Sequence, residues 1–514
     1  MESMRYIRSL FPDNFSMQKS NQKFVLILLA ALAVRLVGIA SRPIWYDEAF
    51  SILFSEKGLS AMLYGTLAPT GAGSADIHPP GYYTMLWLWM RAFGESLVAV
   101  RALSIVAGLI TTWLVYLIAY ELFDSTTALW SMLFSALSPF QVHYAQEIRM
   151  YSFLAMWLML ATLAFFRGAR TRQWRWWILF SIASALAQYT HNLAAFFLIA
   201  LALIPLFQKN WKTLRSVVLA SFLAVVFCSP WLMQLPAQFA KVQQGYWVER
   251  PDASRLFTLL IVYVTNTPLP DAWIMIALLI VLVAVAIGIL QTVRAHRRDN
   301  TSNGVWIFYL SFAPPMLLFL FSQWKPVYIE RALLPSGAMF CIWLAWVITR
   351  TNLSNAVRIF LLGILTLASM MGIYEHATYR DFPYGPFQEL DVSLKERIEQ
   401  GDVIVHSNKL TMLPAILFDR DLPQSFIADL PGSDADTLAP ATQEVLKIKA
   451  TEDIQVATAD AGRVWYVMFQ RAIDELGATG QATHPDLEYL NSRYRLVSQE
   501  EWDGLQVYLY ARQP

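Results

Sequence analysis

The chain has 514 residues, of which 56% are hydrophobic and 15% are charged, and its mean hydropathy is +0.41. Soluble proteins average about 45–50% apolar and about 25% charged residues, so this composition excludes a soluble globular protein and predicts many membrane spans. The net charge of +1 hides two unlike parts, because residues 1–374 carry a net charge of +12 and residues 375–514 a net charge of −11.

The first apolar run, residues 23–40, is predicted to be an anchor helix that stays in the protein. Arg35 interrupts the run, no small-residue cleavage site follows it, and many further apolar runs come after it, which together disfavour a signal peptide. The two cysteines, Cys228 and Cys341, lie inside later apolar runs and provide no disulfide framework.

Apolar runs along residues 1–374 predict a transmembrane domain of about eleven helical spans. The run at residues 81–93 has only 13 residues, which is short for a span of about 20. We therefore expect it to lie flat on the outer membrane surface, within a long outer loop at residues 41–97. The predicted spans are residues 24–40, 98–120, 127–142, 152–166, two within 176–207, and then 216–235, 273–293, 305–322, 332–349 and 358–374.

The cation-rich loops indicate how the chain is oriented in the plasma membrane. Basic loops are retained on the cytoplasmic side, which places the N-terminus inside and, after an odd number of spans, the acidic tail outside. Residues 375–514 are predicted to form an extracytoplasmic α/β domain, with strands near 401–408, 463–469 and 505–512. The basic clusters are Arg5, Arg8, Lys19 and Lys23, then Arg167–Arg175, Lys209–Arg215, Arg294–Arg298, and Arg350 with Arg358.

Counting the spans places four polar clusters on the same outer face. The clusters are Trp45–Glu48, Asp76–Gly81, Gln146–Tyr151 and Trp324–Arg331. Each one alone has an ordinary structural explanation, such as a solvated loop start, a helix-start turn or an interfacial cation that snorkels toward water. Cations on the outer side run against the positive-inside tendency, however, and a lipid phosphate would account for them.

Taken together, the clusters resemble the lipid-linked-sugar glycosyltransferases of GT-C type, which include protein O-mannosyltransferases and aminoarabinose transferases. Asp47-Glu48 matches the acidic motif that opens the first outer loop in that family, and His78-Pro79-Pro80 matches a later motif in the same loop. Glu147-x-Arg149 matches the start of the next outer loop, and residues 331–335 match an Arg-Tyr-Leu-x-Pro-like motif. The resemblance covers about residues 24–374 and does not extend to the tail.

Two positions depart from the family pattern. Ala332 replaces the Tyr of the late motif, which puts an aromatic role there in doubt. Met150-Tyr151 stand where the aminoarabinose enzymes carry an Asp shortly after the Arg of the second loop.

The resemblance implies a membrane glycosyltransferase that moves a hexosyl or pentosyl group from a polyprenyl phosphate to a lipid, glycan or protein acceptor, with inversion. Asp47 is the expected base for the incoming hydroxyl, and Glu48 is expected to orient the acceptor or the loop. The leaving phosphate gains negative charge, which Arg149 and Arg331 are expected to stabilise, with Lys325 as a weaker third cation.

The remaining candidates surround these residues. Glu147, Tyr151 and Tyr328 are placed with the substrate- and phosphate-binding set. For His78, contact with substrate and capping of the flat helix both stay open, and the structural role is favoured. His191 and Tyr189 are expected to satisfy a tight outer turn. Arg35 either pairs with Asp47 or Glu48 or only snorkels.

Other functions remain open at this point. A transporter or flippase would show broken helices, inverted repeats and charge at the bilayer midplane, and a glycan polymerase or ligase would use a large outer loop late in the chain. A non-enzymatic scaffold is a third alternative. No cofactor is implied, although a divalent metal stays open, and the expected partners are the sugar donor, the acceptor and membrane lipids, with no nucleic acid.

Overall fold

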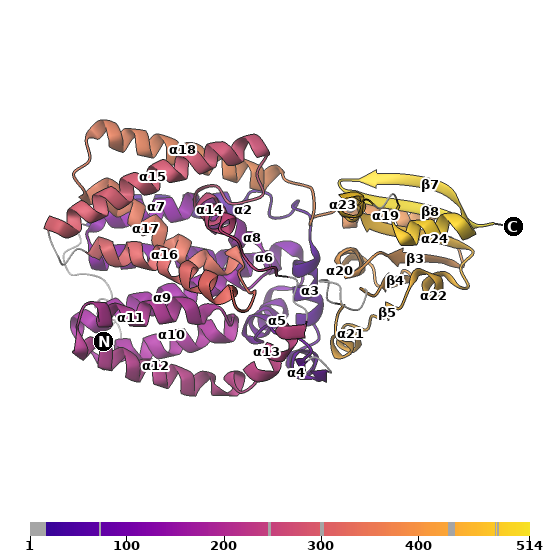
Figure 1. The fold of residues 1–514 in the computed structure, drawn as a ribbon, viewed down its shortest axis with the longest axis horizontal. Coiled ribbons are helices and arrows are strands. Elements are labelled where there is room, and N and C mark those ends of the chain that lie inside the picture. The colour runs from indigo at the N-terminus through magenta and orange to yellow at the C-terminus, as the bar shows by residue number, and fades with distance from the viewer. Residues whose placement is uncertain are drawn as a thin grey trace.

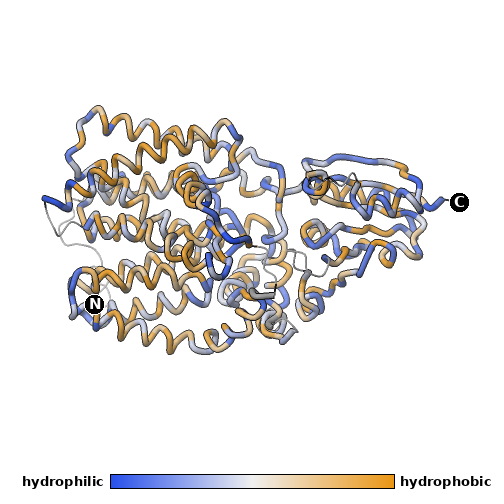
Figure 2. Tube along the Cα trace, in the orientation of Figure 1, coloured by the Kyte–Doolittle hydropathy of each residue, from blue (hydrophilic) through white to orange (hydrophobic). Residues whose placement is uncertain are grey.

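The computed structural model describes residues 17–70, 73–244, 248–298, 303–429, 437–478, 480 and 483–513. A bundle of long helices forms one part, and a sheet covered by short helices lies at one end of that bundle (Figure 1). Apolar residues dominate the length of the bundle helices, and polar residues gather at their ends and in the second part (Figure 2). The Arg5 and Arg8 of the basic N-terminal arm lie outside the described residues.

Every segment predicted as a span is mostly helical, and the first one ends its helix at Leu36, before the predicted end at residue 40. Within the described residues, seven helices are long and apolar enough to cross a membrane by length and composition. The bundle helices are α2 (Met17–Leu36), α6 (Leu97–Leu122), α7 (Ser125–Leu137), α8 (Pro139–Gln146), α9 (Tyr151–Thr171), α10 (Trp174–Thr190), α11 (Ala194–Phe207), α12 (Trp211–Leu232), α15 (Asp271–Arg298), α16 (Asn303–Ser322), α17 (Leu334–Arg350) and α18 (Asn355–Thr378).

One predicted span, residues 127–142, is broken into α7 and α8. Pro139 has no N–H to donate, so the carbonyls of the preceding turn need other partners. Arg35 supplies them: its Nη1 donates to the Ala136 carbonyl at 3.0 Å and its Nη2 to the Ser135 carbonyl at 3.5 Å. The buried Arg35 therefore stabilises this break and does not pair with Asp47 or Glu48.

Short elements cover the end of the bundle that faces the sheet (Figure 1). The predicted outer loop 41–97 contains two helices that the sequence did not predict, α3 and α4, and α5 has the predicted bounds. Whether α5 lies flat on the membrane stays a prediction. The elements are α3 (Tyr46–Ser55), α4 (Leu59–Leu67), β1 (Pro69–Thr70), β2 (Gly73–Ser74), α5 (Gly81–Phe93), α13 (Leu235–Gln244), α14 (Ser254–Val264) and the 3-10 turn η1 (Glu330–Leu333).

The tail folds around a six-stranded mixed sheet in the order β5-β4-β3-β6-β8-β7. The neighbours of β3 are parallel to it, and β8 runs antiparallel to β6 and β7. The three predicted strands are present as β3, β6 and β8. The elements are α19 (Phe387–Arg397), β3 (Asp402–His406), α20 (Lys409–Phe418), β4 (Gln424–Ile427), α21 (Pro440–Leu446), β5 (Ala450–Thr451), α22 (Ile454–Thr458), β6 (Arg463–Phe469), α23 (Gln470–Ala478), α24 (Pro485–Arg493), β7 (Tyr494–Trp502) and β8 (Leu505–Arg512).

The sheet part, formed by the elements from α19 to β8, packs against the bundle through apolar and polar contacts. Helix α18 runs through Thr378, so the boundary expected at residue 375 falls inside its last turn. Met412 and Leu413 of α20 belong to the same apolar core as α3 of the bundle. Arg420 also forms an ion pair with Glu56 at the end of α3, with an N–O distance of 2.6 Å. These contacts fix the sheet part over the end of the bundle.

Candidate active site

Asp47 lies in the first turn of α3 and contacts two arginines that are far away in sequence. Its Oδ2 is 3.0 Å from Nη1 of Arg331 and 3.5 Å from Nε of Arg149. Arg331 belongs to η1 at the start of α17, and Arg149 lies between α8 and α9. The structure therefore brings together three residues that the sequence analysis placed in three separate outer segments.

Both arginines are held from several sides. The Arg149 side chain is 3% exposed, and its Nη1 donates to Ser51 Oγ and to Tyr83 Oη, both at 3.3 Å. The Arg331 guanidinium lies over the rings of Trp45 and Tyr151, with distances to the ring centroids of 5.7 and 5.2 Å. Such stacking holds the plane of a guanidinium while leaving its edge available for oxygen ligands.

The electrostatics of this cluster favour an anion. Burial disfavours the charged form of Asp47, but the guanidiniums of Arg149 and Arg331 outweigh it, and the pKa of Asp47 is lowered below its ordinary value. One ionised carboxylate faces two guanidiniums, so the cluster keeps an excess positive charge. A phosphate group would balance that charge with bidentate hydrogen bonds.

Glu48 has a different environment from its neighbour Asp47. Its side chain is 0% exposed, and its two oxygens accept from Arg101, which is also 0% exposed, at 3.1 and 3.3 Å. Glu48 Oε1 also accepts from the backbone N–H of Ile148 at 3.2 Å. Of the two roles expected for Glu48, these contacts correspond to orienting the loop, since they tie the first outer loop to the second.

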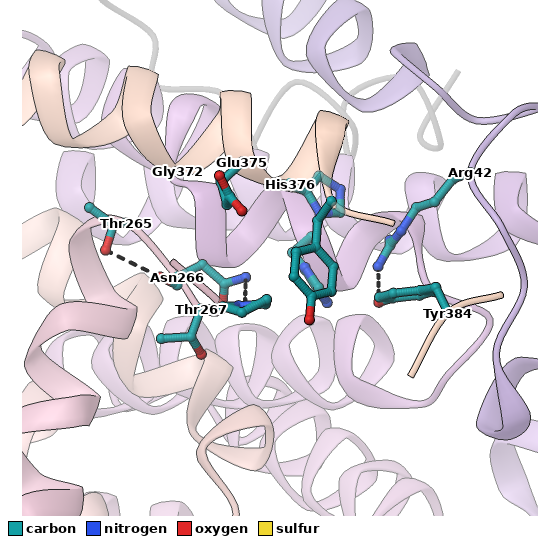
Figure 3. A pocket seen from close by; sticks show the side chains of 11 residues that line it. Arg42, Thr265, Asn266, Thr267, Gly372, Glu375, His376 and Tyr384 are labelled. Atoms are coloured by element: carbon teal, nitrogen blue, oxygen red, sulfur yellow. Dashed lines mark hydrogen bonds between the residues drawn. The ribbon is translucent and has the colours of Figure 1, made fainter. Parts of the chain in front are cut away.

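Glu147 faces a second polar cluster that includes the tail. Its Oε1 is 3.0 Å from Nε2 of His143 and accepts from the Tyr384 hydroxyl at 3.4 Å. Arg42 donates to the same Tyr384 hydroxyl and lies 3.9 Å from Glu147. A small cavity is lined by Arg42, His143 and Tyr384 together with His376 of α18 (Figure 3). Burial raises the pKa of Glu147.

Of the other predicted residues, His78 lies near this region, whereas Lys325 and Tyr328 lie elsewhere. His78 Nδ1 is 2.9 Å from Asp76 Oδ1, and its ring lies 6.3 Å from that of His191. Lys325 and Tyr328 show no described contact with Asp47. The ammonium of Lys325 lies over the ring of the exposed Trp324, and Tyr328 is buried against Phe319.

Sequence reasoning missed five residues that build this region: Arg42, Ser51, Tyr83, Arg101 and Tyr384. Ser51 and Tyr83 carry no signal beyond their helical spacing. A cation in an apolar run, such as Arg101, is the one feature that flags a buried ion pair. Among the described residues, no group of three or more His, Cys, Asp or Glu side chains lies close enough together to hold a metal ion.

Comparisons with known proteins relate this geometry to characterised chains. Residues 77–233 match the family model described as dolichyl-phosphate-mannose-protein mannosyltransferase. An undecaprenyl phosphate-alpha-4-amino-4-deoxy-L-arabinose arabinosyl transferase of Pseudomonas aeruginosa (strain UCBPP-PA14) is 28% identical over 370 residues, which cover 67% of this chain and 63% of that enzyme. The enzyme of the same name from Pseudomonas paraeruginosa (strain DSM 24068 / PA7) is 30% identical over 242 residues, covering 44% of this chain and 42% of that enzyme. The matches span less than two thirds of the relatives' length.

Solved structures extend the likeness to both parts of the chain. The crystal structure of ArnT from Cupriavidus metallidurans in the apo state superposes with a TM-score of 0.62 at 13% identity, covering 96% of this chain and 98% of that one. The chain has the GT-C fold. This GT-C chain is also similar to the apo oligosaccharyltransferase of Archaeoglobus fulgidus, with a TM-score of 0.54 at 12% identity and coverage of 98% and 75%.

These findings confirm the family resemblance indicated by the motifs and the predicted fold class of a polytopic helical membrane protein with a C-terminal domain. The chain is a multi-pass membrane protein with a helical bundle and a C-terminal sheet. The region that matches the mannosyltransferase model contains His78 and Arg149, whereas Asp47 and Arg331 lie outside it.

Proposed function

We propose that the protein is a glycosyltransferase that moves a sugar from a polyprenyl phosphate to an acceptor hydroxyl or amine at the extracytoplasmic face of the membrane. The observation that carries this proposal is the position of Asp47 between Arg149 and Arg331. A carboxylate and two guanidiniums at one point provide a base for the acceptor and cations for the departing phosphate. The relatives named above act on undecaprenyl-phosphate sugars, as their names state.

The displacement balances without a further reactant. The acceptor oxygen or nitrogen forms a bond to the anomeric carbon while the bond from that carbon to the phosphate oxygen breaks, which inverts the configuration. Asp47 takes the acceptor proton, and the polyprenyl phosphate leaves with one additional negative charge. Arg149 and Arg331 contact that phosphate, and by shifting their hydrogen bonds to it they make Asp47 a stronger base in the loaded site.

The supporting residues have separate roles in this proposal. Tyr151 holds the Arg331 guanidinium, and Glu147 links the second outer loop to Arg42, His143 and Tyr384. His78 fixes the turn that precedes α5. Lys325 and Tyr328 remain outside the proposed site because their described contacts are to Trp324 and to the apolar core.

The orientation in the membrane is part of the proposal. The turns between α9 and α10 and between α11 and α12 carry Arg172 and Lys209, and Arg350 and Arg358 flank the turn between α17 and α18. All three turns lie at the end away from the sheet (Figure 1). That end is therefore cytoplasmic, and the sheet part of the tail is extracytoplasmic. A membrane-impermeant label added to intact cells should modify the sheet part, and protection of the sheet from the label would reverse the orientation.

The decisive experiment measures sugar transfer by the purified full-length protein from a panel of polyprenyl-phosphate hexoses and pentoses. Asp47→Asn keeps the shape but cannot accept a proton, so turnover should fall by about 100-fold or more while donor binding persists. Arg149→Ala should weaken binding and turnover together, and Arg149→Lys should restore only part of each. Near-normal transfer by Asp47→Asn would reject Asp47 as the base.

A further inference from the structure

His191 presents a buried polar atom without a hydrogen-bond partner in the described structure, beside the proposed site. The residue follows α10 and is 7% exposed, and its Nε2 is the unpaired atom. Its ring lies 5.8 Å from that of Tyr151, whose hydroxyl is also buried and unpaired in the described structure. Buried polar groups nearly always have partners, so two neighbouring exceptions indicate a ligand.

The second ring nitrogen of His191 fixes which atom carries the proton. Nδ1 accepts a hydrogen bond from the backbone N–H of Leu193 at 3.1 Å, so Nδ1 is unprotonated. In a neutral imidazole the proton must then be on Nε2. Burial lowers the pKa of His191 well below its usual range, which keeps the ring neutral. Nε2 is therefore a hydrogen-bond donor.

The turn that carries His191 is held firmly in place. Asn192 Nδ2 donates to the carbonyl of Ile77 and to Gln238 Oε1, both at 3.0 Å. Trp231 Nε1 donates to Asn192 Oδ1 at 2.8 Å. Hydrogen bonds of the Asn192 side chain thus hold the turn in place. The turn does not need a hydrogen bond from Nε2 of His191.

We propose that His191 Nε2–H donates a hydrogen bond to a phosphate oxygen of the polyprenyl-phosphate donor, as a substrate-binding residue beside Arg149 and Arg331. This inference rests on the proposed function. Tyr151 links the two groups, because its ring centroid lies 5.8 Å from that of His191 and 5.2 Å from the Arg331 guanidinium. A neutral donor adds direction to the phosphate contact without adding repulsion between cations.

Two isosteric variants separate binding from a role in the turn. The amide of Asn overlays Nδ1, so His191→Asn keeps the acceptor for Leu193 and removes the outer donor. The longer amide of Gln overlays Nε2, so His191→Gln keeps the outer donor and loses the inner acceptor. Ligand binding predicts that Gln is the better substitute, whereas a turn-only role predicts that Asn is.

The experiment measures the affinity of the full-length protein for undecaprenyl phosphate, together with the thermal unfolding midpoint. His191→Asn should bind about tenfold more weakly with an unchanged midpoint, while His191→Gln should keep more of the affinity. Equal affinity of His191→Asn and the natural protein would overturn the role of His191. Failure of the natural protein to bind undecaprenyl phosphate would instead reject the proposed function.

A polar cavity of about 600 Å³ lies at the other end of the bundle, among the ends of α6, α15, α16 and α17. Its lining includes three arginines, Arg294, Arg298 and Arg350, together with the apolar side chains of Leu122, Phe123 and Trp346. Arg350 pairs with Asp124 at 2.9 Å, which leaves two positive charges in excess among these residues. The positive-inside tendency explains cations at this end, but it does not explain a cavity that combines them with apolar lining residues.

The geometry points to a binding site for the phosphodiester headgroup of an anionic phospholipid of the inner leaflet. Arg294 and Arg298 are one helical turn apart on α15, so they present their charges on the same face. The apolar lining residues would contact the start of the acyl chains, and basic cavities between membrane helices bind such headgroups in other proteins.

Native mass spectrometry of the full-length protein tests this site with phosphatidylglycerol and phosphatidylcholine in competition. The natural protein should retain phosphatidylglycerol preferentially, and the double variant R294Q/R298Q should lose that preference. The control K212Q/R215Q removes two exposed cations from the same end outside the cavity and should retain it. Unchanged preference in R294Q/R298Q, or full displacement of the lipid by inorganic phosphate, would contradict a phospholipid site.

Discussion

At the scale of single residues, two adjacent carboxylates have unlike environments. Asp47 faces Arg149 and Arg331, whereas the side chain of Glu48, the next residue on α3, is buried against Arg101. Neighbouring residues on a helix point about 100° apart, so an Asp-Glu pair can supply one reactive group and one structural group. The sequence shows the pair but not the partners, since Arg101 is 53 residues away.

The pH dependence of transfer should report the pKa of Asp47. An ordinary Asp carboxyl has a pKa of about 4. The two guanidiniums lower the pKa of Asp47, so Asp47 stays ionised until the pH falls below that ordinary value. Arg331→Gln removes one of these cations, so the pKa should rise and the acidic limb of kcat/KM should move to higher pH. The control Arg255→Gln removes a half-exposed cation paired with Glu330 and should leave the limb in place. An identical acidic limb in Arg331→Gln would show that another group controls it.

The pair of Glu48 and Arg101 should matter for stability more than for chemistry. Both side chains are 0% exposed, so Glu48→Gln leaves Arg101 as a buried cation without its carboxylate. Breaking such a pair from one side costs about 3–5 kcal/mol. The thermal unfolding midpoint in detergent should drop, and Arg101→Gln added to Glu48→Gln should recover part of the loss. An unchanged midpoint together with lost transfer would assign Glu48 to catalysis instead.

At the scale of elements, the close packing of the His78–Gly81 turn explains its composition. A Cβ atom at Gly81 would lie 2.4 Å from the carbonyl oxygen of Tyr189, at the end of α10. The glycine therefore allows the start of α5 to pack against the backbone of α10. Helix α5 in turn carries Tyr83, the hydrogen-bond partner of Arg149. The motif acts on the site through the placement of a helix.

Gly81→Ala should therefore affect both stability and transfer. The added methyl group must push α5 away from a backbone oxygen, which cannot move like a side chain, at a cost of about 1–3 kcal/mol. The shift moves Tyr83 away from Arg149, so turnover should fall along with the thermal midpoint. Gly363→Ala is a matched control, because a Cβ at Gly363 meets nothing within 4 Å. If both variants behave alike, the close approach at Gly81 has no consequence.

The sequence predicted elements well where their hydrophobic pattern alone decides the structure. The long apolar runs, the bounds of α5 and the buried strands β3, β6 and β8 were all found in this way. It missed α3 and α4, because short helices inside a long polar segment lack a decisive periodicity, and it missed β7, an exposed edge strand with little apolar signal. Asp47, Arg149 and Arg331 were identified through motifs, but the placement of Glu147 depends on Tyr384, 237 residues away.

At the scale of the whole molecule, the sheet part reaches the site through the segment that follows α18. Tyr384 lies in this segment, and its hydroxyl contacts Arg42 and Glu147. Its ring lies 6.2 Å from that of Trp45, which in turn covers the Arg331 guanidinium. A continuous set of contacts thus runs from the tail to the cation beside Asp47. The tail is therefore part of the structure that positions the site.

Substitutions of Tyr384 should separate the hydroxyl from the ring. Tyr384→Phe keeps the ring against Trp45 and loses the two hydrogen bonds, so turnover should fall by about five- to tenfold, the effect of about 1 kcal/mol. Tyr384→Ala also removes the support of Trp45 and should lower turnover further. Because α20 and α21 anchor the sheet part independently on α3 and α4, the resistance of the tail to protease should persist in both variants. Tyr489→Phe changes a partly buried tail tyrosine that packs against the core of the sheet part and should leave turnover unchanged. Turnover by Tyr384→Ala equal to that of the natural protein would mean that the tail is attached to the site without supporting it.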